Sequence, residues 1–214
     1  MIKIHVLSAG GQLDRYSTRL GDITESVTAE IAKHLPLSGV DVTFQYNPAA
    51  TIPEVGMCGY APTGHLVQIS LDPFNARFDA ELEVELRGTL AHELHHCMRW
   101  RGPGYGSSLG AALVSEGLAR DFETKFRPNL TLPAYHRRLS NPQTDHLLQI
   151  AKIARTNTPY NHSEWFYAGS EESGIPPFAG YDLGLTIVRK FIERSGRDSG
   201  QLWNEPAESF YEQL

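Results

Sequence analysis

The chain has 214 residues, of which 41% are hydrophobic and 21% are charged, and its formal net charge at pH 7 is -6. This composition is typical of a soluble globular protein and excludes a largely disordered chain. Because 25 acidic residues outnumber 19 basic ones and no basic run occurs, nucleic acid is excluded as a partner. No apolar run approaches the roughly 18 residues that a membrane span needs, so we expect no membrane partner.

The first residues, MIKIHVLSAGG, have neither the long apolar region nor the small-residue cleavage site of a secretory signal. The two cysteines, Cys58 and Cys97, could form at most one disulfide, and their surroundings do not repeat a disulfide scaffold. We therefore expect a cytoplasmic protein with two reduced thiols. Nothing in the sequence indicates an oligomeric state.

The first part of the chain alternates strand and helix patterns. Residues 2–9 alternate apolar and polar side chains and predict a strand, and residues 17–34 repeat apolar side chains at helical spacing until Pro36. The runs GVDVTFQYN (39–47) and HLVQISLDP (65–73) predict two further strands that end at turn residues. These elements predict a small sheet with a helix packed on it.

The rest of the chain is mainly helical. Residues 75–100 carry an unbroken apolar stripe at i,i+4 spacing, and after a glycine-rich loop residues 109–126 again suit a helix. Residues 141–155 and 180–196 predict a shorter and a longer helix. We predict an α+β fold in a single domain, residues 1–214, with an α/β part of about 1–100 and a helical part of about 101–214.

The run GTLAHELHHCMRW, residues 88–100, indicates a metal site. On a helix, His92 and His96 lie only about 40° apart, so two imidazoles project toward one point, as zinc requires. Glu93, between them, borders that point. A catalytic zinc needs a third protein ligand and one open position. Glu116, in the following predicted helix, is the candidate because small residues flank it on its own face.

The order of these residues resembles a known group of enzymes. HELHH followed by the Glu of SEGLA is similar to the gluzincin pattern of thermolysin-like metallopeptidases. The blocks GHLVQISLDP, TLAHELHHCMR, EGLARDF and GYDLG together resemble a family of small, uncharacterised predicted zinc-dependent proteases. The resemblance implies a zincin-like domain, with a small mixed sheet whose edge strand packs against the active-site helix. It also implies a peptide or protein substrate laid along that edge strand.

The resemblance and the residues together assign roles. His92, His96 and Glu116 are expected to hold Zn²⁺, and Glu93 is expected to take a proton from the attacking water during peptide hydrolysis. Tyr181, between glycines in FAGYDLGL, is the candidate donor to the oxyanion, with His162 as its rival.

Several alternatives remain open at this point. His95 could replace His96, since i,i+3 residues also share a helix face. The thermolysin-like pattern has an aspartate four residues after the ligand glutamate, but this chain has Arg120 there, and Asp121 or Glu123 could orient a histidine ligand instead.

The predicted strand at residues 65–71 could lie at the sheet edge or inside the sheet. The Cys58 thiolate could occupy the open zinc position. In the alternative function, the protein is a non-catalytic, zinc-stabilised binding or chaperone-like protein that retains the fold.

Overall fold

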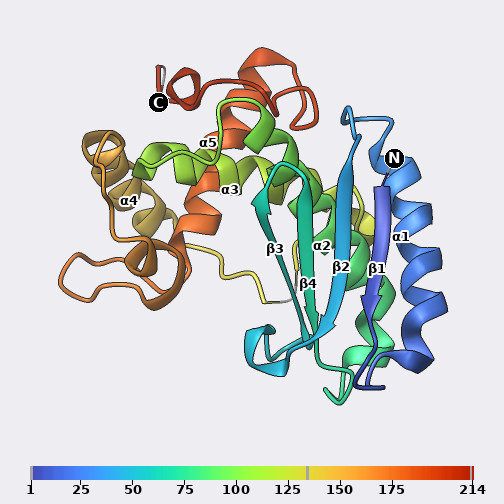
Figure 1. The fold of residues 1–214 in the computed structure, drawn as a ribbon. Coiled ribbons are helices and arrows are strands. Elements are labelled where there is room, and N and C mark those ends of the chain that lie inside the picture. The colour runs from blue at the N-terminus through green and yellow to red at the C-terminus, as the bar shows by residue number, and fades with distance from the viewer. Residues whose placement is uncertain (1, 134, 213) are drawn as a thin grey trace. The chain divides into compact units, whose positions relative to one another are not determined.

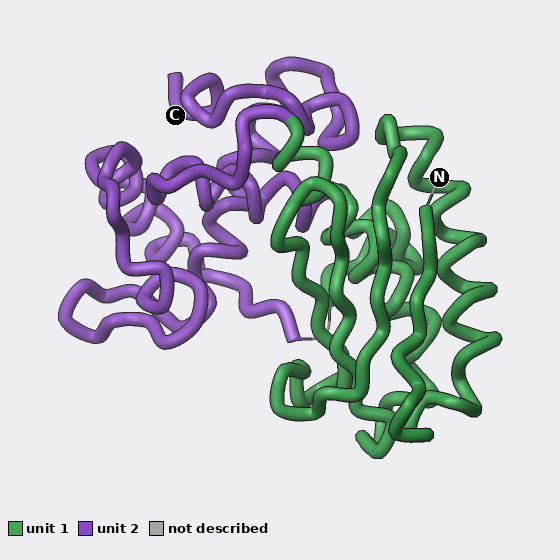
Figure 2. The backbone as a smooth tube through the Cα atoms, in the orientation of Figure 1, with its two compact units in different colours: residues 1–101, 122–134 green, residues 102–121, 135–214 purple. Residues whose placement is uncertain are grey.

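A computed structural model of the protein describes residues 2–133, 135–212 and 214. The chain divides into two compact units, coloured differently in Figure 2. Unit 1 consists of residues 1–101 and 122–134, and unit 2 consists of residues 102–121 and 135–214. This division does not test the expectation of a single domain, which stays a prediction.

Unit 1 contains a four-stranded mixed sheet with the strand order β1-β2-β4-β3 (Figure 1). Its strands are β1 (Ile2–Leu7), β2 (Val40–Tyr46), β3 (Met57–Thr63) and β4 (Leu66–Leu71). β1, β2 and β4 pair in parallel, whereas β3 is antiparallel to β4. The sheet and the helices around it confirm the predicted α+β class.

Strand β3 is the element that the sequence analysis missed. Gly59 and Pro62 interrupt its hydrophobic pattern, and its pairing with β4 shifts register between Tyr60 and Thr63. Both features are tolerated at a sheet edge, because one side of an edge strand forms no backbone hydrogen bonds with another strand. β4, by contrast, pairs on both sides. The alternative that placed residues 65–71 at the edge is therefore wrong, and β3 occupies that position.

Two helices, α1 (Ser17–Ile31) and α2 (Phe78–Arg101), pack on the sheet in unit 1. Their apolar side chains meet the inner face of the sheet, to which β2 contributes the buried Val42 and Phe44. The leucine stripe predicted for α2 is buried along its whole length, and the polar side of the helix between Thr89 and His96 is buried as well. The candidate site residues of α2 are therefore buried.

Unit 2 is built on the helices α3 (Leu109–Thr124), α4 (Asn141–Ala154) and α5 (Ala179–Ser195). Their facing sides form one hydrophobic core. The last three residues of α3 belong to unit 1, so this helix contributes to both units. The described residues also form five short helical turns: η1 (Asp14–Tyr16), η2 (Pro48–Ala50), η3 (Pro128–Leu130), η4 (Glu164–Ala168) and η5 (Ala207–Phe210).

The helices of the described residues include none with the length and apolar character needed to cross a membrane.

Glycines bring the backbones of α3 and α5 into contact. A Cβ atom added at Gly117 would overlap the backbone of Gly184, and one added at Gly184 would overlap the carbonyl of Leu113. Glycine is unfavourable inside a helix, so its presence at both positions is explained by this close approach. Because Glu116 directly precedes Gly117, this contact also restricts the direction in which Glu116 projects from α3.

We predict that Gly117→Ala lowers the free energy of unfolding by about 1–3 kcal/mol, because overpacking outweighs the gain in helix propensity. Gly21→Ala, in α1, is the matched control because no atom lies within 4 Å of its added Cβ. That variant should be stabilised by up to about 1 kcal/mol. Urea unfolding of both variants measures the difference, and equal stabilisation by the two substitutions would contradict the close contact.

Candidate metal centre

Helix α2 places the imidazoles of His92 and His96 against each other. The two Nε2 atoms are 3.1 Å apart, and the rings are inclined at 74° with their centroids 4.7 Å apart. Two imidazole nitrogens bound tetrahedrally to zinc at about 2.0–2.1 Å would be separated by about 3.3 Å. The separation of the two nitrogens therefore suits a shared zinc ion.

Glu116, on α3, completes a group of three possible ligands. One ligand atom from each of His92, His96 and Glu116 lies within 4.8 Å of the others, and all three residues are buried. Two imidazoles and a carboxylate are a ligand set that catalytic zinc commonly has. The described residues thus contain a cluster that could hold a metal ion.

Tyr105 fixes one oxygen of the Glu116 carboxylate. Its hydroxyl donates a hydrogen bond to Glu116 Oε1 at 2.8 Å. Burial, and then the negative charge of Glu116, raise the pKa of Tyr105 far above its usual value, so the phenol stays protonated and remains a donor. The sequence analysis did not single out Tyr105. The only local signal is its position between Gly104 and Gly106 in the loop that precedes α3.

Glu93 lies on α2 beside His92 and packs under the edge strand. A Cβ atom added at Gly59 of β3 would lie 2.5 Å from Glu93 Cγ and 2.7 Å from Thr89 Cγ2. Only glycine lets the strand approach this closely. Burial, and then the nearby charge of Glu93, raise the pKa of the Cys97 thiol to about 12. Cys97 is therefore a packed thiol rather than a reactive one.

His95 faces a different environment from its two neighbours. It is fully buried, and its ring packs against that of Phe122 with 5.4 Å between the centroids. His96, rather than His95, is the residue whose Nε2 approaches His92. The geometry therefore favours the i,i+4 pair.

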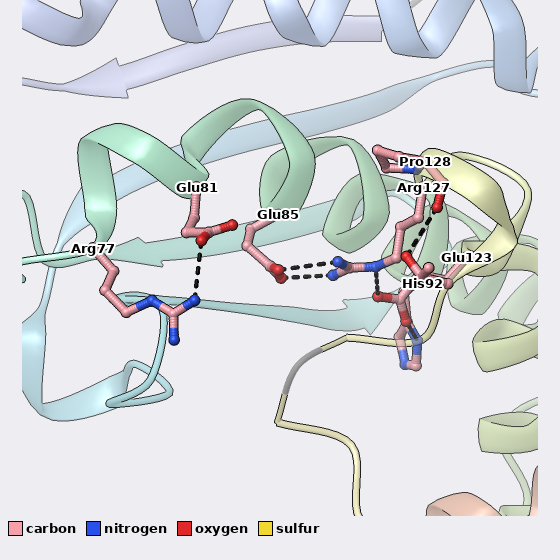
Figure 3. A network of polar contacts seen from close by, with 8 residues as sticks. Arg77, Glu81, Glu85, His92, Glu123, Arg127 and Pro128 are labelled. Carbon is pink, nitrogen blue, oxygen red and sulfur yellow. Dashed lines mark hydrogen bonds and ion pairs between the residues drawn. The ribbon is translucent and has the colours of Figure 1, made fainter.

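A carboxylate also lies behind His92, on the side away from His96. Glu123 Oε2 is 3.2 Å from His92 Nδ1, and Glu123 Oε1 accepts a hydrogen bond from Arg127 Nε at 2.8 Å (Figure 3). Asp121, the other candidate for this role, accepts a hydrogen bond from Arg189 instead, at 3.1 Å. Of the two carboxylates suggested by the sequence, Glu123 is the one that contacts a histidine of the cluster.

Both candidate oxyanion donors contact Phe166 in unit 2. Tyr181, in the first turn of α5, packs edge-on against Phe166 with 5.3 Å between the ring centroids. The Arg120 guanidinium lies 5.4 Å from the centroid of the Tyr181 ring. His162 stacks on Phe166 at 4.7 Å, and its Nδ1 is 2.8 Å from the hydroxyl of Tyr160. Burial lowers the pKa of His162, and the charge of Glu116 partly opposes this shift. The role of Tyr181 stays a prediction.

Cys58 lies outside the ligand cluster of the described residues. It precedes Gly59 on β3, and successive side chains of a strand point to opposite faces of the sheet. Because the Cβ direction of Gly59 points at α2, the Cys58 thiol faces away from that helix. Its sulfur donates to the Gly59 carbonyl at 3.5 Å. The idea that Cys58 occupies a zinc position is therefore not supported.

A comparison with protein families gives a match over residues 21–212 to the family described as Predicted Zn-dependent protease (DUF2268). The protein belongs to this family. The match confirms the resemblance to this family that was inferred from the blocks GHLVQISLDP, TLAHELHHCMR, EGLARDF and GYDLG. The family's name implies dependence on zinc, and the chain has a cluster of two histidines and a glutamate that could bind it. Neither a curated protein nor a solved structure matches the chain.

We predict that Cys97 resists alkylation in the folded protein whereas Cys58 reacts. With a pKa of about 12, only about one Cys97 thiol in ten thousand would be ionised at pH 8. Mass spectrometry after brief iodoacetamide treatment should find the label on the half-buried Cys58 alone, and on both residues after unfolding in urea. Equal labelling of the two thiols in the folded state would contradict the environment described for Cys97.

Proposed function

We propose that the protein is a zinc-dependent peptidase that hydrolyses peptide bonds. The observation that carries the proposal is the convergence of His92, His96 and Glu116, with Glu93 next to the first histidine on a buried helix face. Membership of the predicted Zn-dependent protease family supports the same activity. We expect it to act in the cytoplasm on peptides or proteins, as a single zincin-like domain.

In this proposal His92 and His96 would hold zinc through ring nitrogens and Glu116 would hold it through a carboxylate oxygen. Bound there, zinc would lower the pKa of a coordinated water toward about 7 and polarise the substrate carbonyl. The hydrogen bond from Tyr105 restricts the orientation of the Glu116 carboxylate. Burial of all three ligands limits competition from bulk water.

Glu93 acts as the general base. Its carboxylate accepts a proton from the attacking water and delivers it to the nitrogen of the leaving amine. The close approach of Gly59 to Glu93 restricts the side chain of this glutamate. An immobilised carboxylate loses less entropy when the reacting groups align than a mobile one would. Tyr181 is the proposed donor to the oxyanion, with His162 as the alternative.

Strand β3 is the proposed binding surface for the substrate backbone. The Met57 carbonyl accepts a hydrogen bond from Ile52 N–H at 3.1 Å, so it points away from β4. Backbone groups alternate in direction along a strand, and Gly59 therefore presents its N–H and carbonyl on the same outer edge. The Ala61 carbonyl beyond it accepts from Trp100 Nε1 at 2.8 Å. An extended peptide would thus pair with β3 at Gly59, directly over Glu93.

We predict that Glu93→Gln lowers the rate of peptide hydrolysis by at least about 100-fold while leaving bound zinc at one ion per chain. Glu81→Gln, at a partly exposed position on the same helix, is the control and should retain full activity. The two measurements are cleavage of a peptide library and elemental analysis of the purified variants.

Retained hydrolysis by Glu93→Gln would contradict the assigned general base. A wild-type protein that binds one zinc ion but cleaves no peptide in the library would favour the zinc-stabilised binding protein instead. These outcomes separate the loss of catalysis from the loss of the metal.

A further inference from the structure

A chain of buried polar contacts leads from His92 away from the proposed metal. It joins His92 to Glu123, Glu123 to Arg127, and Arg127 to Glu85 (Figure 3). The side chains of Glu123, Arg127 and Glu85 are 1%, 2% and 5% exposed, respectively. Buried charges are costly unless they are paired and hydrogen-bonded, so such a chain indicates a specific role.

The geometry at Arg127 uses the planar shape of the guanidinium. Its Nη1 and Nη2 donate to the two oxygens of Glu85 at 3.0 Å and 2.6 Å, while Nε donates to Glu123 at 2.8 Å. Three donors are therefore held in one plane by two carboxylates. A lysine ammonium has no such fixed arrangement of donors.

Helix α2 leaves space for this guanidinium at Gly88, one turn before His92. A Cβ atom added at Gly88 would lie 2.6 Å from Arg127 Nε and 2.9 Å from its Cζ. Glycine in a helix interior is unfavourable, and no turn is needed here. The passage of Arg127 across α2 accounts for a residue that helix formation alone would not select.

Helix α3 supplies carboxylates to both sides of His92. Glu116 and Glu123 are seven residues apart, which places them two turns apart on the same helix face. Glu123 lies against Nδ1 of His92, and Glu116 joins the cluster formed around its Nε2. Helix α3 thus places one carboxylate near each ring nitrogen of His92.

We propose that Arg127, held by Glu85, is a positioning residue that sets the orientation of Glu123 and thereby strengthens metal binding by His92. Glu123 accepts the Nδ1–H of His92, so that the unprotonated Nε2 faces the metal. A carboxylate in this position fixes the tautomer and raises the basicity of the ligand nitrogen. This inference rests on the proposed function, because it concerns the same zinc ligand.

The test measures the dissociation constant of zinc by competition with a chromogenic chelator. Glu123→Gln keeps the side-chain volume and should weaken zinc binding about 10- to 100-fold. Arg127→Lys keeps the charge but loses the planar donors, and Glu85→Gln removes one carboxylate charge from the guanidinium without touching His92. Both should weaken zinc binding by about tenfold or less.

The control is the exposed ion pair of Arg77 and Glu81 near the start of α2, whose 3.0 Å contact involves the same residue types. Arg77→Lys and Glu81→Gln should bind zinc as the wild type does. Imidazole ¹⁵N NMR provides a second readout: His92 should carry its proton on Nδ1 in the wild type and lose this preference in Glu123→Gln.

The outcomes distinguish this inference from the function on which it rests. If the wild type binds no zinc, both fail. If the wild type binds zinc, but folded Glu123→Gln matches its affinity and its His92 tautomer, the positioning role is overturned and the peptidase proposal stands. Circular dichroism of the metal-free variants establishes folding. If Glu123→Gln does not fold, the same comparison is made with Arg127→Lys, whose unchanged affinity would equally overturn the role.

Discussion

The approach of the His92 and His96 Nε2 atoms to 3.1 Å is the contact on which the rest of the site depends. Two unprotonated imidazole nitrogens repel each other at this distance unless a proton or a cation lies between them. The protein places this pair on a buried face of α2 and adds the carboxylate of Glu116. Neutral imidazole and carboxylate are ligands that zinc accepts, so this cluster could bind a metal ion.

The fold supports this contact from several sides. Gly59 brings the edge strand β3 onto Glu93, and Gly88 makes room for Arg127, which holds Glu123 against His92. At both positions, the absence of a Cβ atom lets a neighbouring element or side chain approach closely. The result is a helix whose polar residues are buried together with its leucines, and buried polar groups need hydrogen-bond partners.

Features that depend on local residue spacing could be predicted from the sequence, but contacts between residues far apart in the chain could not. The i,i+4 spacing predicted α2 and the convergence of its two histidines, and the small residues near Glu116 indicated the third candidate ligand. Strand β3 was missed because Gly59 and Pro62 remove the alternation by which strands are recognised. The partnership of Arg127 with Glu85 joins residues that are 42 positions apart, and neither has a local motif that would reveal it.

X-ray absorption at the zinc edge, on the protein loaded with one equivalent of zinc, tests the central claim most directly. We predict nitrogen and oxygen ligands at about 2.0–2.1 Å, with scattering from two imidazoles and no sulfur at about 2.3 Å. Replacing Glu116 with Ala should remove one oxygen ligand and keep both imidazoles. A sulfur ligand, a single imidazole or an unchanged spectrum in that variant would contradict a centre formed by His92, His96 and Glu116.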